Sequence, residues 1–148
     1  MKLIFLDIDG VMNSATGTGP YFADMEVSKL ELLKKLIVES KSDGIVLISD
    51  RRYSSVYMRE FIDALDQFEI YMVGELRRPK EFAEDIDDNR GKQIMDYLSN
   101  SGNDIERIAI LDDNDEGISD YFEEEYISVN RYYGLTPEIC DKVKAIFN

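Results

Sequence analysis

The stretch "KLIFLDIDGV", residues 2–11, passes from an apolar run into a pair of acids. The unbroken apolar residues before Asp7 are typical of a strand that is buried on both faces of a sheet. Asp7 and Asp9 stand at the end of this run with one residue between them, and Gly10 follows. Because two carboxylates at the end of a hydrophobic strand repel each other, the rest of the chain should supply something that compensates their charge.

Short apolar runs alternate with longer amphipathic segments along the chain. Ser28 is predicted to cap the first helix, and Val56, Phe61, Ile62 and Leu65 are predicted to form the inner face of the second. We predict strands at 2–7, 44–49, 69–74, 107–113 and 126–130, and helices at 28–40, 54–66, 92–100 and 136–147. This alternation predicts an α/β fold: a single Rossmann-like, three-layer sandwich with a central parallel sheet.

Composition favours one domain in a reducing compartment. The chain has 148 residues, of which 44% are hydrophobic, and this length suits a single domain over 1–148. Its only cysteine is Cys140, so no internal disulfide can form, and no apolar run is long enough to cross a membrane. We therefore predict a cytoplasmic protein without a membrane partner. The oligomeric state is left open.

Charge and the absence of histidine exclude several kinds of chemistry. The net charge of −14 disfavours a general nucleic-acid or anionic-membrane surface, although a local basic patch could override it. The chain has no histidine, which excludes Ser-His-Asp catalysis, Cys-His catalysis and His-ligated zinc. Chemistry must therefore come from carboxylates, Lys, Arg, Ser, Thr or Tyr, or from a hard metal ion held by oxygen atoms.

Polar residues follow several predicted strands, where open α/β sheets bind their ligands. Asp7 and Asp9 follow the first strand, and "LDD" places Asp112 and Asp113 at the end of a later one. Four carboxylates at one edge need a compensating cation, and Mg²⁺ suits carboxylates, water and a substrate phosphate. The same edge should receive Ser49, Arg51 and Arg52 from a second strand and Lys92 from the start of a helix.

These residues resemble the four signatures of the haloacid dehalogenase (HAD) superfamily of phosphohydrolases. "FLDIDGV" matches the whole first motif, a strand that ends in Asp-x-Asp-Gly. Ser49 matches the second motif and Lys92 the third, while "ILDD" matches the acidic pair of the fourth. A narrower resemblance, in "LDIDGVMNS", "IVLISDRR", "RGKQIMDYL" and "IAILDDND", is to the small HAD domains of RNA-repair and phage-type proteins. Those domains usually have Ser-Ser-Trp-Arg where this chain has Ser-Asp-Arg-Arg from Ser49 onward.

The resemblance implies a Mg²⁺-dependent phosphomonoester hydrolase. Asp7 would be the nucleophile, forming an aspartyl-phosphate, and Asp9 the general acid and base. Mg²⁺ would be held by the Asp7 carboxylate, the Asp9 carbonyl and the pair Asp112 and Asp113, with the member that touches the ion left open.

Phosphate binding would fall to other residues of the same motifs. Ser49 and Lys92 would contact the phosphoryl oxygens, and Gly10 would let the chain turn sharply beside the substrate. Arg51 or Arg52 could clamp the phosphate, and the Ser-x-Arg of polynucleotide kinase-phosphatase 3′-phosphatase modules favours Arg51.

The interval between the first motif and the first predicted helix is short, and the interval between Ser49 and Lys92 is filled by a helix, a strand and a loop. Neither has room for a sizeable cap domain, so the site should be open to a large substrate. Basic residues gather between 51 and 92, which suggests a nucleotide or a nucleic-acid end phosphate as substrate, although a solvated loop with salt bridges would give the same pattern. Another phosphorylated small molecule also remains a candidate substrate. The order of the acids disfavours a response-regulator receiver domain. The alternative is a catalytically weak or inactive HAD-fold domain that binds phosphate or another protein.

Overall fold

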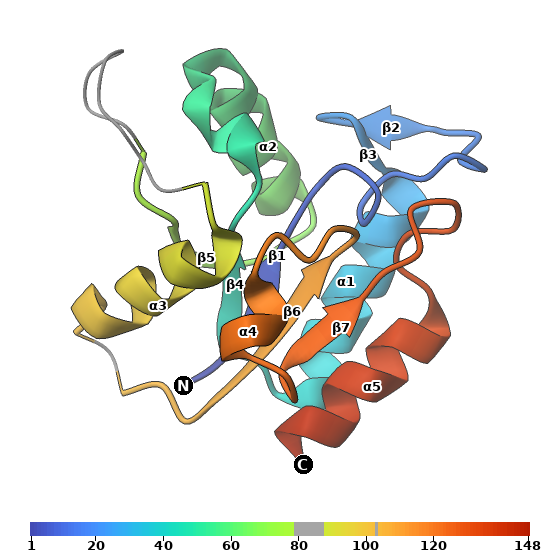
Figure 1. Cartoon of the computed structure of the whole chain (residues 1–148). Coiled ribbons are helices and arrows are strands. Elements are labelled where there is room, and N and C mark those ends of the chain that lie inside the picture. Colours follow the sequence, from blue (N-terminus) through green and yellow to red (C-terminus); the bar gives the residue numbers. More distant parts are fainter. Residues whose placement is uncertain (79–87, 103) are drawn as a thin grey trace.

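The computed structural model describes residues 1–78, 88–102 and 104–148, and its centre is a parallel sheet covered by helices on both faces (Figure 1). The sheet has five strands in the order β5-β4-β1-β6-β7, and every neighbouring pair is parallel. The strands are β1 (Lys2–Leu6), β4 (Gly44–Leu47), β5 (Met72–Glu75), β6 (Arg107–Asp112) and β7 (Tyr126–Ser128). The predicted α/β fold with a central parallel sheet is confirmed.

The helices divide between the two faces because side chains alternate along each strand. Ile4 and Leu6 of β1 point to one core, and Leu3 and Phe5 point to the other. Helices α1, α2 and α5 supply the first core, while α3 and α4 supply the second. The helices are α1 (Val27–Ser40), α2 (Ser55–Gln67), α3 (Arg90–Asn100), α4 (Ile118–Tyr121) and α5 (Pro137–Phe147). In the part of the chain that the structure describes, no helix is both long and apolar enough to span a bilayer.

The first predicted helix cap was wrong. Helix α1 begins at Val27 with Glu26 in the cap position, so Ser28 already lies inside the helix. Glu26 ends strand β3 and its backbone N–H donates to the Met12 carbonyl, so the preceding strand rather than a capping side chain determines where the helix begins.

The predicted inner face of α2 was half right. Phe61 and Leu65 are buried, but Val56 and Ile62 are exposed. The buried face also includes Tyr57, Met58 and Ala64. The tyrosine ring, the thioether and the small alanine side chain therefore rotate the buried face of α2 away from Val56 and Ile62.

A two-stranded antiparallel sheet after β1 was not predicted. Strand β2 (Tyr21–Phe22) pairs with β3 (Met25–Glu26), and such short strands leave no alternating pattern in the sequence. Between β4 and α3, the described residues form only the 3₁₀ turn Asp50–Tyr53, α2 and β5. Neither interval contains a cap domain among the described residues, and the carboxyl edge of the sheet stays accessible.

Candidate active site

Three aspartates meet where β1 and β6 end. The two strands pair in parallel with Leu6 opposite Leu111, and the Asp7 N–H donates to the Leu111 carbonyl at 3.0 Å. Asp7 therefore lies beside Asp112, the last residue of β6, and Asp113 follows it. Carboxylate oxygens of the three residues lie within 4.8 Å of one another. The predicted convergence of strand ends thus places three of the four acids in one cluster.

Burial makes this cluster electrostatically unfavourable in the absence of a cation. Asp112 is only 3% exposed and Asp7 is partly buried. Burial raises the pKa of Asp7 above its usual value. Burial, and then the charge of Asp7, raise the pKa of Asp112. A hard divalent cation with oxygen ligands would reverse both effects, so the donor set fits a metal such as Mg²⁺.

Asp9 lines the same cavity but is not part of this cluster, and it pairs with Arg51. Arg51 Nε donates to Asp9 Oδ2 at 2.9 Å and Nη2 donates to Oδ1 at 2.7 Å, which is a bidentate ion pair. Asn13 Nδ2 also donates to Oδ1, at 3.1 Å. The hydrogen bonds from Arg51 are the main reason that the pKa of Asp9 is lowered. Asp7 and Asp9 therefore have opposite electrostatic surroundings although one residue separates them.

Ser49 and Gly10 shape the wall of the site. Ser49 is buried after β4, and its Oγ accepts the Arg51 N–H at 3.2 Å, so it also caps the 3₁₀ turn. Gly10 has a φ of +81°, and an added Cβ would lie 2.4 Å from Asp113 Oδ2. No larger residue fits there without moving Asp113.

The adjacent arginines of the second motif have different surroundings. Arg52 is fully buried, and its guanidinium donates to the carbonyls of Ile48, Ser49 and Leu76 at 2.9, 3.0 and 3.1 Å. Arg51 lies at the rim of the site instead. Substrate binding by either residue stays a prediction, but the structure gives Arg52 the contacts of a residue that holds the turn in place.

The buried cation next to the acids is Arg90. It is 5% exposed, and its Nη2 donates to Asp50 at 3.2 Å and to Glu116 at 3.4 Å. Its Nε and Nη1 are buried and have no hydrogen-bond partner among the described residues. Arg90 and Asp7 line the same cavity, and the positive charge of Arg90 offsets part of the rise in the pKa of Asp7. An anion is the natural partner for these two donors.

Lys92, the predicted third-motif residue, lies two residues after Arg90 in α3 and is exposed. Its backbone N–H donates to the Asn89 side chain that caps the helix. It does not line the cavity around Asp7, whereas Arg90 does. A contact between Lys92 and substrate stays a prediction. In the sequence, Arg90 is one of the basic residues that gather between 51 and 92.

A close approach of backbones explains why Arg90 points inward. A Cβ added to Gly91 would lie 2.3 Å from the Gly117 carbonyl oxygen, so α3 begins directly against the loop after β6. The Arg90 N–H donates to the Glu116 carbonyl at 2.8 Å. The glycine after Arg90 was the available signal in the sequence, because glycine in the first turn of a helix often marks tight packing.

The groups around Asp7 line an open cavity of about 240 Å³. Arg51, Arg90 and Arg131 are the cations that line it within the described ranges. Arg131 was not predicted, and its Nε lies 3.4 Å from Asp113 Oδ2. The cavity thus combines a buried acid cluster with three guanidinium groups.

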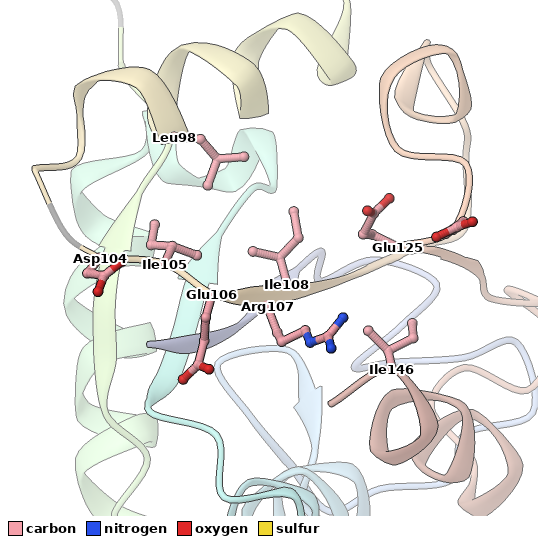
Figure 2. A pocket seen from close by; sticks show the side chains of 9 residues that line it. Leu98, Asp104, Ile105, Glu106, Arg107, Ile108, Glu125 and Ile146 are labelled. Carbon is pink, nitrogen blue, oxygen red and sulfur yellow. The ribbon is translucent and has the colours of Figure 1, made fainter. Parts of the chain in front are cut away.

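A second cleft, of about 540 Å³, lies at the opposite edge of the sheet (Figure 2). Its floor includes Leu98 from α3, Ile108 from β6 and Ile146 from α5. It adjoins Arg107, where β6 begins, whereas Asp112 ends that strand. None of the predicted site residues lines this cleft.

A parallel sheet with an Asp-x-Asp strand end beside a second acidic strand end defines a small domain of the HAD superfamily. The family model described as "HAD domain in Swiss Army Knife RNA repair proteins" matches residues 3–140, so the chain belongs to this family. A search of curated proteins finds no match.

Proposed function

We propose that the chain is a Mg²⁺-dependent phosphomonoester hydrolase that works through an aspartyl-phosphate at Asp7. One observation carries the proposal: the cluster of Asp7, Asp112 and Asp113 lies beside the buried, unpaired donors of Arg90. A metal ion would balance the acids and a phosphoryl group would satisfy the arginine, so one phosphate–metal pair resolves both. Membership of a HAD family supports phosphohydrolase chemistry at this site.

The reaction follows from which groups face the cavity. Asp7 attacks phosphorus in line, and the bond from phosphorus to the leaving oxygen breaks as Asp9 gives that oxygen a proton. Asp9 then takes a proton from water, which attacks the phosphorus and frees Asp7 with inorganic phosphate. Ser49 and Arg90 hold the phosphoryl oxygens through both steps.

The chain offers a set of oxygen ligands for the metal. Asp7, Asp112 and Asp113 would hold Mg²⁺ through carboxylates, and Asp9 through its backbone carbonyl, since its carboxylate pairs with Arg51. When bound, the ion supplies positive charge next to the phosphoryl oxygens. It would also keep Asp7 ionised, which a nucleophile requires.

For substrate we propose a nucleotide or a nucleic-acid end phosphate. The support is the family description, the open carboxyl edge and a pair of exposed tyrosines, Tyr132 and Tyr133, next to Arg131. Aromatic rings beside a phosphate site can stack on bases. A cytoplasmic location remains part of this proposal.

The basic stretch gives weaker support than its sequence suggests. Arg52 and Arg90 are buried, Arg51 is paired with acids, and Lys80 lies outside the described residues. These residues therefore add little positive charge to the exposed surface, which leaves Arg59, Arg77, Arg78 and Lys92 as the exposed basic residues of the stretch within the described part of the chain.

Hydrolysis of p-nitrophenyl phosphate tests the proposal. We expect turnover that requires Mg²⁺, and a loss of about 10³-fold or more in kcat for Asp7→Asn. Asp63→Asn, on the exposed side of α2, is the control for the same chemical change away from the site. A lack of metal-dependent turnover, or an unimpaired Asp7→Asn variant, would leave the inactive binding domain as the better interpretation.

A further inference from the structure

Arg51 joins two elements across the mouth of the site. Besides its bidentate pair with Asp9, its Nη1 donates to Asp24 Oδ2 at 2.7 Å, in the turn between β2 and β3. Its guanidinium carbon lies 4.8 Å from the centre of the Tyr57 ring on α2. Asp9, Asp24 and Tyr57 thus surround a guanidinium whose side chain is still 28% exposed.

Arg51 lies directly against the carboxylate of Asp9. Both carboxylate oxygens accept hydrogen bonds from Arg51, and Oδ1 also accepts one from Asn13. A carboxylate oxygen has two lone pairs, so Oδ2 can still accept a second hydrogen bond. Under the proposed function, a leaving oxygen must come within hydrogen-bond distance of Asp9. A leaving group in that position therefore lies next to the Arg51 guanidinium.

A partly buried guanidinium that gives up hydrogen bonds to one carboxylate favours another anion in its place. The other two arginines of the cavity have different neighbours: Arg90 lies beside Asp7, and Arg131 lies beside Asp113. Arg51 alone lies beside Asp9, on the side where the leaving group must sit. Its anchors at Asp24 and Tyr57 would hold it at the rim while its remaining donors change partner.

We propose that Arg51 is a specificity-determining residue, which exchanges Asp9 for a second phosphate carried by the leaving group. This inference rests on the proposed function and names its substrate class: phosphomonoesters whose alcohol bears another phosphate. The planar guanidinium suits a phosphate because it can donate two parallel hydrogen bonds. The second phosphate can be an internucleotide diester or a second monoester on the same nucleoside.

A set of substrates that differ in one charge tests this role. The first is a dinucleotide with a terminal phosphate, and the second has the same bases and phosphate but a neutral methylphosphonate linkage. A nucleoside bisphosphate and the matching monophosphate test the other source of charge. Each pair is made with the cleaved phosphate on the 3′ and on the 5′ side, and kcat/KM is measured with Mg²⁺.

For wild type we expect the charged member of at least one pair to be favoured by about 10-fold, the effect of a charge-assisted contact worth about 1.4 kcal/mol. Arg51→Gln should bring that ratio close to one, and Arg51→Lys should restore part of it. Arg59→Gln, the same change at an exposed site on α2, should keep the wild-type ratio.

A ratio near one in wild type for every pair would overturn the inference. So would an Arg51→Gln variant that loses activity equally on charged and neutral substrates, because that result assigns Arg51 a purely structural role. If no substrate is hydrolysed, including p-nitrophenyl phosphate, the proposed function itself fails. The two failures are therefore distinguishable.

Discussion

Two groups of acids share the carboxyl edge of the sheet and differ in what balances their charge. At the base of the cavity, Asp7 and Asp112 are buried beside Asp113, and their pKa values are raised. At the rim, Asp9 and Asp24 are more exposed and share Arg51. The rim is balanced by a side chain of the protein, whereas the base has a deficit of positive charge that a ligand could fill.

The comparison shows how one short motif can supply two kinds of carboxylate. Asp7 and Asp9 have the same chemistry and are two residues apart, yet burial governs one pKa and an arginine governs the other. A nucleophile such as Asp7 benefits from a bound metal ion that keeps it ionised. An acid–base group such as Asp9 benefits from a partner that can move away while the group exchanges a proton. The predictions below test this division, beginning with the largest expected effect.

Replacement of the buried Arg90, at the base of the cavity, should cause a large loss of activity. We expect Arg90→Met to lower kcat/KM by about 10²-fold, because the phosphoryl group loses a preorganised cation in a partly buried site. Lys92→Met, two residues along the same helix, is the matched control and should have a smaller effect. Steady-state kinetics, with thermal melting to verify folding, measures both. A larger loss in Lys92→Met would restore the lysine as the third-motif residue.

Mg²⁺ should stabilise the base of the cavity and leave the rim unaffected. At about 100 times its dissociation constant, a ligand adds about 2.7 kcal/mol of stability, so we expect the Tm to rise by about 5 to 10 °C. Asp112→Asn should abolish most of this shift. Asp9→Asn should retain it, since only the backbone carbonyl of Asp9 is assigned to the ion. A shift that survives Asp112→Asn would place the metal elsewhere.

The two groups should respond oppositely to pH in the metal-free protein. Where a folded-state pKa is raised, the folded protein binds more protons than the unfolded chain, so stability falls as pH rises. Asp7 and Asp112 should therefore make wild type lose stability from about pH 4 to about pH 9, and Asp112→Asn should flatten this slope. Urea unfolding at each pH measures it.

The contribution of Asp9 to stability changes with pH in the opposite direction, because its folded-state pKa is lowered. Its contribution is present above its unfolded pKa and is lost as pH falls through the lowered value. Asp9→Asn should thus be less stable than wild type near neutral pH, and the difference should narrow below about pH 4. A difference that stays constant with pH would mean that Arg51 does not perturb Asp9 in solution.

Much of the site could be predicted because strand ends are local features of the sequence. Continuous apolar runs identify β1 and β6, and the residues directly after them must emerge at the same edge of a parallel sheet. This places Asp7 beside Asp112 and Asp113 without knowledge of any side-chain contact. The helix predicted over 136–147 likewise begins at its cap residue, Thr136, whose Oγ1 accepts the Ile139 N–H at 3.4 Å.

The arginines could not be assigned in this way. Arg51 at the rim and the buried Arg52 are consecutive residues, and the difference comes from carbonyl groups as distant in sequence as Leu76. Arg90 was overlooked in favour of Lys92 because the packing of Gly91 against Gly117 is visible only in three dimensions. Along a turn or helix, each successive side chain points in a different direction. A small error in the predicted position of a residue therefore becomes a large error in where its side chain points.

The sequence by itself determined the order along the chain of the central-sheet strands and the four long helices, and the edge at which the acids gather, because hydrophobic runs and strand ends are short-range properties. Only the tertiary structure decided which cation serves which acid. That choice depends on burial and on hydrogen-bond partners from distant segments, as when Arg51 joins Asp9 to Asp24 and Arg90 lies beside Asp7. The fold therefore turns one cluster of like charges into a buried group that fits a metal and a paired group at the rim.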